Sequence, residues 1–204
     1  MNPTAVHVAV FDTLADWEIG YATAHIRRDS WQREPGRYPV VTVGPSREPV
    51  TTMGGLRVTP DIALAGLRPE DSAMLILAGG DRWDQDSMAG FRAAARRFLT
   101  AGVPVAAICG ATYGLAIEGL LDDRAHTSNA AEYLASSGYA GGDRYVAEPA
   151  VTDGNLITAS ATAPVHFASA IFARLGLYEP EVAASWFKLY GDRDPAGYFE
   201  LMSA

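Results

Sequence analysis

Cys109 is the residue whose type and setting most clearly indicate chemistry. It is the single cysteine among 204 residues, and it stands between an apolar run at 103–108 and Gly110, where a helical pattern begins. Such a strand-to-helix turn projects a nucleophile outward, and the N-terminus of the following helix favours the thiolate. The setting therefore predicts a reactive thiol, in preference to the alternative of a buried structural cysteine.

Backbone N–H groups of glycines are placed to assist that thiol. The N–H of Gly110 can stabilise an oxyanion that forms beside the sulfur. Its expected partner is an N–H of Gly79 or Gly80, directly after the apolar run at 73–78, and Gly80 is the predicted second donor. Because ligands bind at the carboxyl ends of parallel strands, we expect these glycines to lie at one edge of a sheet.

Glu18 is the carboxylate predicted to lie beside the thiol. It falls in the first turn of a helical pattern at 16–28, where the alternative role is a favourable interaction with the helix dipole. An ionised carboxylate would raise the pKa of a neighbouring thiol. Glu18 is therefore expected to stay protonated and to share one negative charge with Cys109.

His126 is the histidine best placed to act as a base. It lies in a short segment after the helix that follows the cysteine, and a position facing the pocket and a structural position both remain open. His7, His25 and His166 fall in predicted strands and helices and are expected to be structural. The histidines lack metal-ligand spacing, and one cysteine cannot build a zinc site. The glycine motifs of nucleotide-binding sites are missing too, so neither metal nor cofactor is expected.

Short β-rich runs alternate with helical patterns along the chain. The predicted strands are 6–11, 39–43, 73–78 and 103–108, with hairpins around 53–55 and across 151–157. The predicted helices are 16–28, 88–100 with Ser87 as its cap, 111–120, 130–137, 164–175 and 179–189. Such alternation predicts an α/β fold with a doubly wound, mostly parallel sheet and helices on both faces. We expect one domain over 1–204.

Composition restricts the class of protein. A formal net charge of −8 and a pI of about 4.9 disfavour binding to nucleic acid or anionic membranes. Residues 103–121 approach the length of a membrane span, but Pro104, Gly110 and Gly114 favour a buried strand followed by a helix. The first residues do not resemble a signal peptide. We therefore expect a cytoplasmic protein with no nucleic-acid or membrane partner.

Several motifs together resemble the ThiJ/PfpI superfamily, also described as class I glutamine amidotransferase-like. They are AAICGA at 106–111, LILAGG at 75–80, DWE at 16–18, GGLRVTPD at 54–61 and HTSN at 126–129. The resemblance covers nearly the whole chain. It implies a flavodoxin-like fold, usually dimeric, with the elbow cysteine at Cys109 and the neighbouring glutamate at Glu18.

Two departures from that superfamily bear on the reaction. Protease-like members carry a histidine directly after the cysteine, where this chain has Gly110, and the late H-x-E of true glutaminases is absent. Asn129 is the counterpart of a histidine that some relatives use. We expect a small-molecule hydrolase or lyase that uses Cys109, Glu18 and the Gly80 and Gly110 N–H groups.

Two other hypotheses remain. In the first, Cys109 is oxidised reversibly in a redox or stress-response protein that turns nothing over. In the second, the protein is a dimeric regulatory module without catalysis. The expected partners are accordingly a small-molecule substrate or oxidant and a second copy of the chain.

Overall fold

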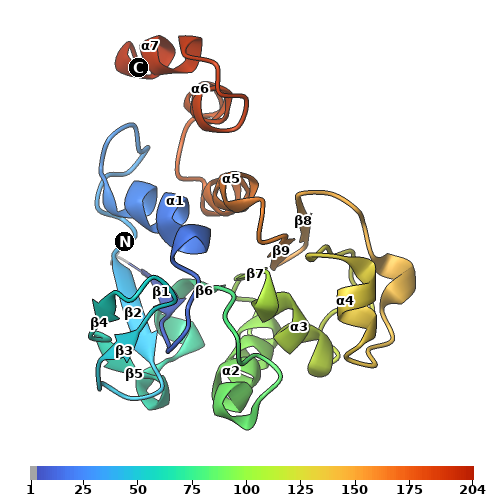
Figure 1. Cartoon of the computed structure of the whole chain (residues 1–204). Coiled ribbons are helices and arrows are strands. Elements are labelled where there is room, and N and C mark those ends of the chain that lie inside the picture. The colour runs from blue at the N-terminus through green and yellow to red at the C-terminus, as the bar shows by residue number, and fades with distance from the viewer. Residues whose placement is uncertain (1–3) are drawn as a thin grey trace.

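The computed structural model describes residues 4–204, which are built around a seven-stranded sheet in the order β5-β2-β1-β6-β7-β9-β8 (Figure 1). The strands are β1 (Ala5–Ala9), β2 (Val40–Gly44), β5 (Ile62–Ala63), β6 (Ser72–Leu77), β7 (Val105–Ile108), β8 (Ala150–Asp153) and β9 (Leu156–Ala159). Neighbouring strands run parallel except β8 and β9, which pair antiparallel. This arrangement confirms the predicted mostly parallel, flavodoxin-like α/β sheet.

The central strands are apolar throughout because both faces of the sheet are covered. Successive side chains of a strand point to opposite faces. In β6, Met74 and Ile76 accordingly enter one hydrophobic core, while Leu75 and Leu77 enter the other. The apolar run around 73–78 thus fills two cores at once.

Helices form a layer on each side of the sheet (Figure 1). One face carries α1 (Asp16–Arg27) and α5 (Pro164–Leu175), and the other carries α2 (Ala89–Thr100) and α3 (Gly110–Ile117), with α4 (Ala131–Ala135) beside α3. Beyond α5, α6 (Pro180–Tyr190) is stacked between α5 and α7 (Ala196–Met202). The short elements are β3 (Val50–Thr51), β4 (Arg57–Val58) and the 3-10 turns Leu64–Gly66, Pro69–Asp71, Asp86–Met88 and Gly142–Arg144.

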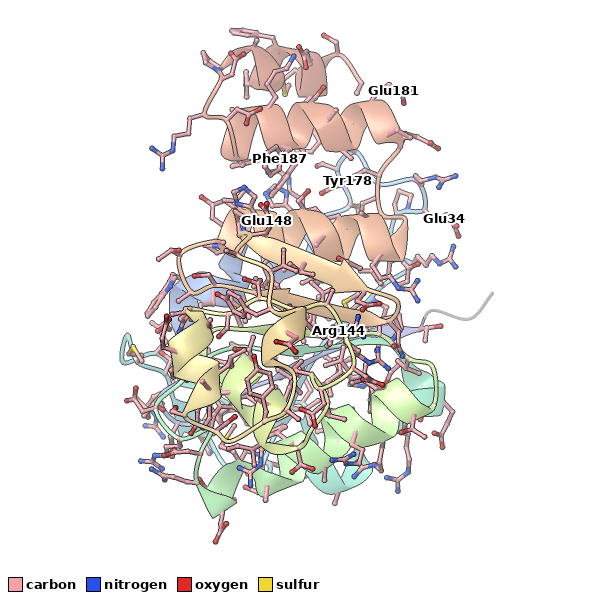
Figure 2. The ribbon with its side chains drawn as sticks, turned by 90° about the vertical axis from the view of Figure 1, so that its right-hand side faces the viewer. Glu34, Arg144, Glu148, Tyr178, Glu181 and Phe187 are labelled. Carbon is pink, nitrogen blue, oxygen red and sulfur yellow. The ribbon has the colours of Figure 1, made fainter. Side chains whose placement is uncertain are left out.

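Aromatic side chains attach α6 to the rest of the molecule. Figure 2 shows Tyr178 and Phe187 in the space between α6 and α5. The ring of Tyr178 lies 5.3 Å from that of Phe172, and the ring of Phe187 lies 5.2 Å from that of His166, between centroids. Trp186 is buried against Phe172 at 5.0 Å. The outer helices therefore extend the core on the α5 side.

Most predicted elements occur within a few residues of their expected bounds, and both predicted hairpins form, as β3–β4 and β8–β9. Two differences stand out. The prediction that Ser87 caps a helix is wrong, because a 3-10 turn occupies Asp86–Met88 and α2 begins at Ala89 without a side-chain cap. The second difference is α7, which was not predicted.

Within residues 4–204, no helix is both long enough and apolar enough to cross a membrane.

Candidate active site

Cys109 occupies the turn between β7 and α3 in a strained backbone conformation. Its φ and ψ are 57° and −124°, in the positive-φ region that side chains other than glycine rarely adopt. The turn is held by the Cys109 N–H, which donates to Ala159 O at 3.0 Å, and by its carbonyl, which accepts from Thr112 N at 3.0 Å and from Thr112 Oγ1 at 2.5 Å. This geometry presents the thiol at the carboxyl end of the sheet, at the partly exposed site expected of an elbow nucleophile.

Glu18 is fully buried next to the thiol. The N–H of Gly79 donates to Glu18 Oε2 at 2.5 Å, whereas Glu18 Oε1 has no hydrogen-bond partner within residues 4–204. Burial raises the pKa of Glu18 from 4.5 to about 7, although the Gly79 N–H and Cys109 act to lower it. The carboxyl can therefore gain and lose a proton near neutral pH.

The thiol itself is not acidic in the resting site. Burial, and then the negative charge of Glu18, raise the pKa of Cys109 to about 11, while hydrogen bonds from Asn129 and Gly110 lower it. The Gly110 N–H at the start of α3 acts in the direction expected of a helix N-terminus, but the cost of burying a charge outweighs the two donors. Protonation of Glu18 removes the carboxylate charge, which after burial is the largest cause of the raised pKa of Cys109.

Asn129 is the polar side chain that contacts the sulfur. Its Nδ2 lies 3.3 Å from Cys109 Sγ, and its Oδ1 accepts from Ala161 N at 2.9 Å. The one sequence signal for this residue is the HTSN segment at 126–129, in which the family resemblance makes Asn129 the counterpart of a histidine. An amide can donate a hydrogen bond to a thiolate, but it cannot remove the proton of a thiol.

His126 is not directed at the sulfur. Its Nδ1 lies 2.8 Å from Arg124 O and its Nε2 lies 3.0 Å from Tyr139 Oη, so both ring nitrogens have other partners. The ring is buried between Tyr139 and Tyr145, and burial lowers its pKa. In this arrangement His126 supports the segment that carries Asn129 rather than the thiol.

Gly80 and Gly110 are brought together beside the cysteine. A Cβ on Gly110 would lie 2.9 Å from Gly80 O, and a Cβ on Gly80 would lie 2.6 Å from Phe11 and 2.9 Å from Thr13 O. Side chains are thus excluded at both positions. The Gly110 N–H interacts with the sulfur of Cys109, as an oxyanion donor at that point would.

A cavity of about 400 Å³ adjoins this site at Gly80. Its lining is polar and carries no cationic side chain: Gly80, Asp81, Trp83, Asp84, Tyr113, Tyr133 and Ser136. Tyr133 is one of these lining residues, and burial, followed by the charges of Cys109 and other neighbours, raises its pKa to about 12. The cavity therefore meets the site at Gly80, which follows Gly79, the glycine whose N–H binds Glu18.

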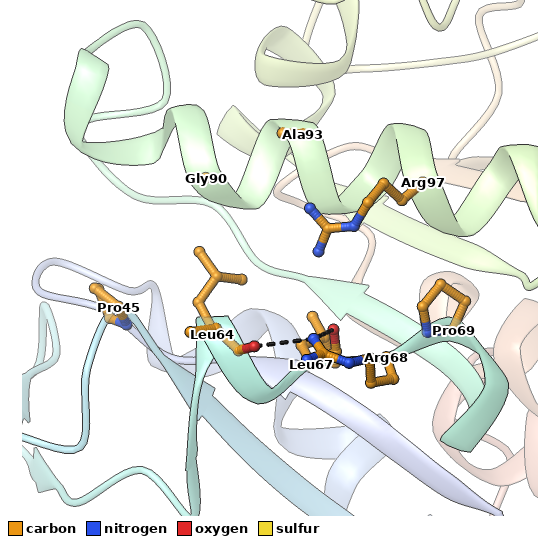
Figure 3. Close-up of a pocket in the computed structure, with 9 residues that line it drawn as sticks. Pro45, Leu64, Leu67, Arg68, Pro69, Gly90, Ala93 and Arg97 are labelled. Carbon is orange, nitrogen blue, oxygen red and sulfur yellow. Dashed lines mark hydrogen bonds between the residues drawn. The ribbon is translucent and has the colours of Figure 1, made fainter.

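A larger cavity, of about 680 Å³, lies elsewhere (Figure 3). Arg97 reaches into it from α2, facing Leu64 and the turn closed by the Leu67 N–H, which donates to Leu64 O at 3.1 Å. None of the site residues lines it. Within residues 4–204, moreover, no group of three histidine, cysteine or acidic side chains is arranged to hold a metal ion.

Comparison with known proteins shows which family the chain resembles. The model of the DJ-1/PfpI family matches residues 4–174. The Bacillus subtilis protein named "Uncharacterized protease YoaZ" is 39% identical over 206 residues, covering 100% of this chain and 98% of its own length. A second Bacillus subtilis protein, "Uncharacterized protease YdeA", is 33% identical over 174 residues, 84% of this chain and 83% of its own.

Solved structures agree with that comparison. The ThiJ/PfpI family protein from Bacillus anthracis has a TM-score of 0.93 and 38% identity, covering 100% of this chain and 97% of its own. The DJ-1 superfamily protein from Agrobacterium tumefaciens has a TM-score of 0.81 and 36% identity, covering 93% and 99% respectively. The sequence, the fold and the elbow cysteine thus lead to one conclusion: the chain belongs to the DJ-1/PfpI family.

Proposed function

We propose that the protein is a small-molecule lyase that converts α-oxoaldehydes into 2-hydroxy acids, with Cys109 as nucleophile and Glu18 as proton shuttle. The observation that carries the proposal is the fully buried Glu18 carboxyl beside the thiol, with its pKa raised to about 7. A general acid–base group is most effective when its pKa lies near the working pH. Glu18 meets that requirement, and Asn129, the other side chain at the sulfur, cannot accept a proton.

The proposed reaction needs one nucleophile and one proton carrier. The sulfur of Cys109 adds to the aldehyde carbon while the thiol proton passes through Glu18 to the aldehyde oxygen, which gives a hemithioacetal. Glu18 then removes the hydrogen from that carbon and returns it to the neighbouring keto carbon, as the hydroxyl proton moves to the keto oxygen. The product is a thioester of a 2-hydroxy acid. Water hydrolyses it and frees the thiol, so the net change is the addition of one water.

Hydrolysis of an amide makes a greater demand on the site. A leaving amine must be protonated, which in cysteine hydrolases is the task of a histidine beside the sulfur. Here Asn129 stands next to the sulfur and both nitrogens of His126 are engaged elsewhere. Addition to an aldehyde releases no amine, so the groups present at Cys109 suit it better.

The cavity next to Gly80 favours substrates without negative charge. Asp81 and Asp84 line it together with Tyr113 and Tyr133, and its lining contains no arginine or lysine to neutralise an anion. A carboxylate or phosphate on the substrate would meet like charge there. Neutral α-oxoaldehydes such as methylglyoxal are therefore the expected substrates.

The experiment is to incubate the protein with methylglyoxal and to quantify lactate by NMR. We expect lactate from the wild type and none from Cys109→Ser, and Glu18→Gln should lower kcat/KM by roughly 10²–10⁴-fold because it cannot carry a proton. Equal lactate formation by wild type and Cys109→Ser would refute the proposal.

One observation favours a second candidate, reversible oxidation of Cys109. Glu18 Oε1 lacks a hydrogen-bond partner within the described chain, and a protonated carboxyl can donate to an oxygen added to the sulfur. Peroxide would then convert the thiol into a sulfenic acid and release water. Intact mass after dilute peroxide, with and without later thiol treatment, tests this: a reversible gain of one oxygen without any aldehyde turnover supports the redox role.

We further propose a homodimer in the cytoplasm, without nucleic-acid or membrane partners. Large apolar side chains are exposed on two helices, Trp17 on α1 and Phe199 and Met202 on α7. The net charge of −8 opposes binding to polyanions, and a free cysteine suits a reducing compartment.

A further inference from the structure

Three hydrogen bonds form a continuous chain from Trp17 to the reactive sulfur. The indole Nε1–H of Trp17 donates to Ala161 O at 3.2 Å, and the Ala161 N–H donates to Asn129 Oδ1 at 2.9 Å. The chain ends at Cys109, because Asn129 Nδ2 donates to Sγ at 3.3 Å. Ala161 thus joins three parts of the chain: α1, the segment between β9 and α5, and the segment before α4.

This chain fixes which end of the Asn129 amide faces the thiol. An N–H group must be met by an oxygen, so the Ala161 N–H holds Oδ1 and leaves the NH₂ group for the sulfur. Asn129 therefore acts as a donor and favours the negatively charged form of Cys109. Without the Ala161 contact the amide could turn over and present its oxygen, which would repel a thiolate.

Trp17 is in the right place to control that contact. Its side chain is 50% exposed, so core packing does not account for its position, yet its N–H reaches a carbonyl 144 residues away along the chain. It directly precedes Glu18 in α1. The first turn of α1 therefore supplies both the carboxyl that opposes a charge on the sulfur and the tether of the amide that stabilises one.

We propose that Trp17 is a positioning residue: through the backbone of Ala161 it holds Asn129 as the donor that stabilises the Cys109 thiolate. This inference rests on the proposed nucleophilic role of Cys109. The Trp17 N–H donates to Ala161 O and not to the sulfur, so its proposed effect on Cys109 passes through Asn129.

The test is the rate of iodoacetamide alkylation of Cys109 as a function of pH, in a double-mutant cycle. Asn129→Ala should slow alkylation near neutral pH by about tenfold or more and move the profile to higher pH, since a hydrogen bond to a charged group is lost. Trp17→Phe keeps an aromatic ring but removes the N–H, and should slow it several-fold in the same direction. Circular dichroism confirms that each variant is folded.

The double variant distinguishes positioning from a general structural effect. Since Trp17 acts through Asn129, adding Trp17→Phe to Asn129→Ala should cause no further change. Trp31→Phe, which removes an indole N–H outside this chain, is the matched control and should leave the profile unchanged. Equal effects of Trp17→Phe in both backgrounds, or an unshifted profile in Trp17→Phe, would overturn the inference.

Alkylation needs no substrate, so this test is separate from that of the proposed lyase activity. Coupling between Trp17 and Asn129 in a protein that leaves methylglyoxal unchanged would support the positioning role of Trp17 and refute the proposed reaction. Turnover of methylglyoxal without coupling would support the reaction and refute the positioning role.

Discussion

Gly79 binds Glu18 through its backbone and, by lacking a side chain, leaves the space in which Glu18 and Cys109 meet. Its N–H donates to Glu18 Oε2 at 2.5 Å. A Cβ at this glycine would lie 2.8 Å from the same carboxyl oxygen and 2.9 Å from Cys109 Sγ. Glu18 and Cys109 are therefore positioned by a residue that has no side chain of its own.

Gly79→Ala is predicted to damage the site more than the fold. The added methyl must displace the thiol or the carboxyl, and we expect a cost of about 1–3 kcal/mol in stability from this overpacking. Alkylation of Cys109 and aldehyde turnover should both fall by at least tenfold, as measured with iodoacetamide and by NMR. Gly66→Ala is the control, because its Cβ would have no atom within 4 Å. Unchanged kinetics in Gly79→Ala would show that the pair does not depend on this geometry.

Glu18→Gln should change how stability depends on pH. The folded protein holds the Glu18 proton more tightly than the unfolded chain, since its pKa is raised from 4.5 to about 7. The stability from this group is complete below pH 4.5 and is lost as the pH rises through 7. Relative to wild type, Glu18→Gln should therefore gain on the order of 3 kcal/mol in unfolding free energy between acid and mildly alkaline pH.

Urea denaturation at several pH values measures that gain. Glu48→Gln makes the same chemical change at an exposed position and is the matched control. If the difference from wild type varied with pH no more for Glu18→Gln than for Glu48→Gln, Glu18 would ionise as easily in the fold as in the unfolded chain.

Glutamine should not be a substrate. Its hydrolysis releases ammonia, and in cysteine hydrolases a histidine beside the sulfur activates the thiol and protonates the leaving nitrogen. Asn129 contacts the sulfur but cannot carry a proton, and both ring nitrogens of His126 have other partners. Incubation with glutamine should therefore yield no ammonia above the level of Cys109→Ser. Ammonia release that disappears in Cys109→Ser would contradict this prediction.

The proposed homodimer predicts a sedimenting mass of twice 21.7 kDa at micromolar concentration. Phe199 and Met202 on α7 are 68% and 62% exposed, and replacing both by serine should shift the protein toward the monomer. Leu56→Ser, at an equally exposed apolar position on the β3–β4 hairpin, should leave the mass unchanged. Sedimentation of the wild type at 21.7 kDa alone would count against dimerisation.

The fold could be predicted because its signals are local. The apolar run 73–78 is followed directly by Gly79 and the run 103–108 by Cys109 and Gly110, while Pro164 and Gly176 mark the two ends of α5. The last helix, α7, was not predicted, although Asp194 and Pro195 directly precede it and the Ala196 N–H donates to Asp194 Oδ1 at 2.9 Å, a start signal that the sequence does carry. Ser87 does not cap a helix because the 3-10 turn Asp86–Met88 occupies that position and α2 begins only at Ala89.

The site was predictable only in part. The turn that presents Cys109 can be read from the order of strand, cysteine, glycine and helix. The partners of Asn129 and His126 cannot, because they depend on Ala161 and Tyr139, which the fold brings near from other segments. The direction of the thiol pKa also required the structure, since burial depends on the packing of the whole site.

The backbone of Cys109 has a final consequence, for selection. A positive φ at a residue other than glycine costs of order 1–3 kcal/mol, and glycine would relieve much of it. A chain selected for stability alone would therefore carry glycine at this turn. Cysteine at position 109 carries a backbone cost that glycine would relieve, and the proposed nucleophile is what a glycine there would give up.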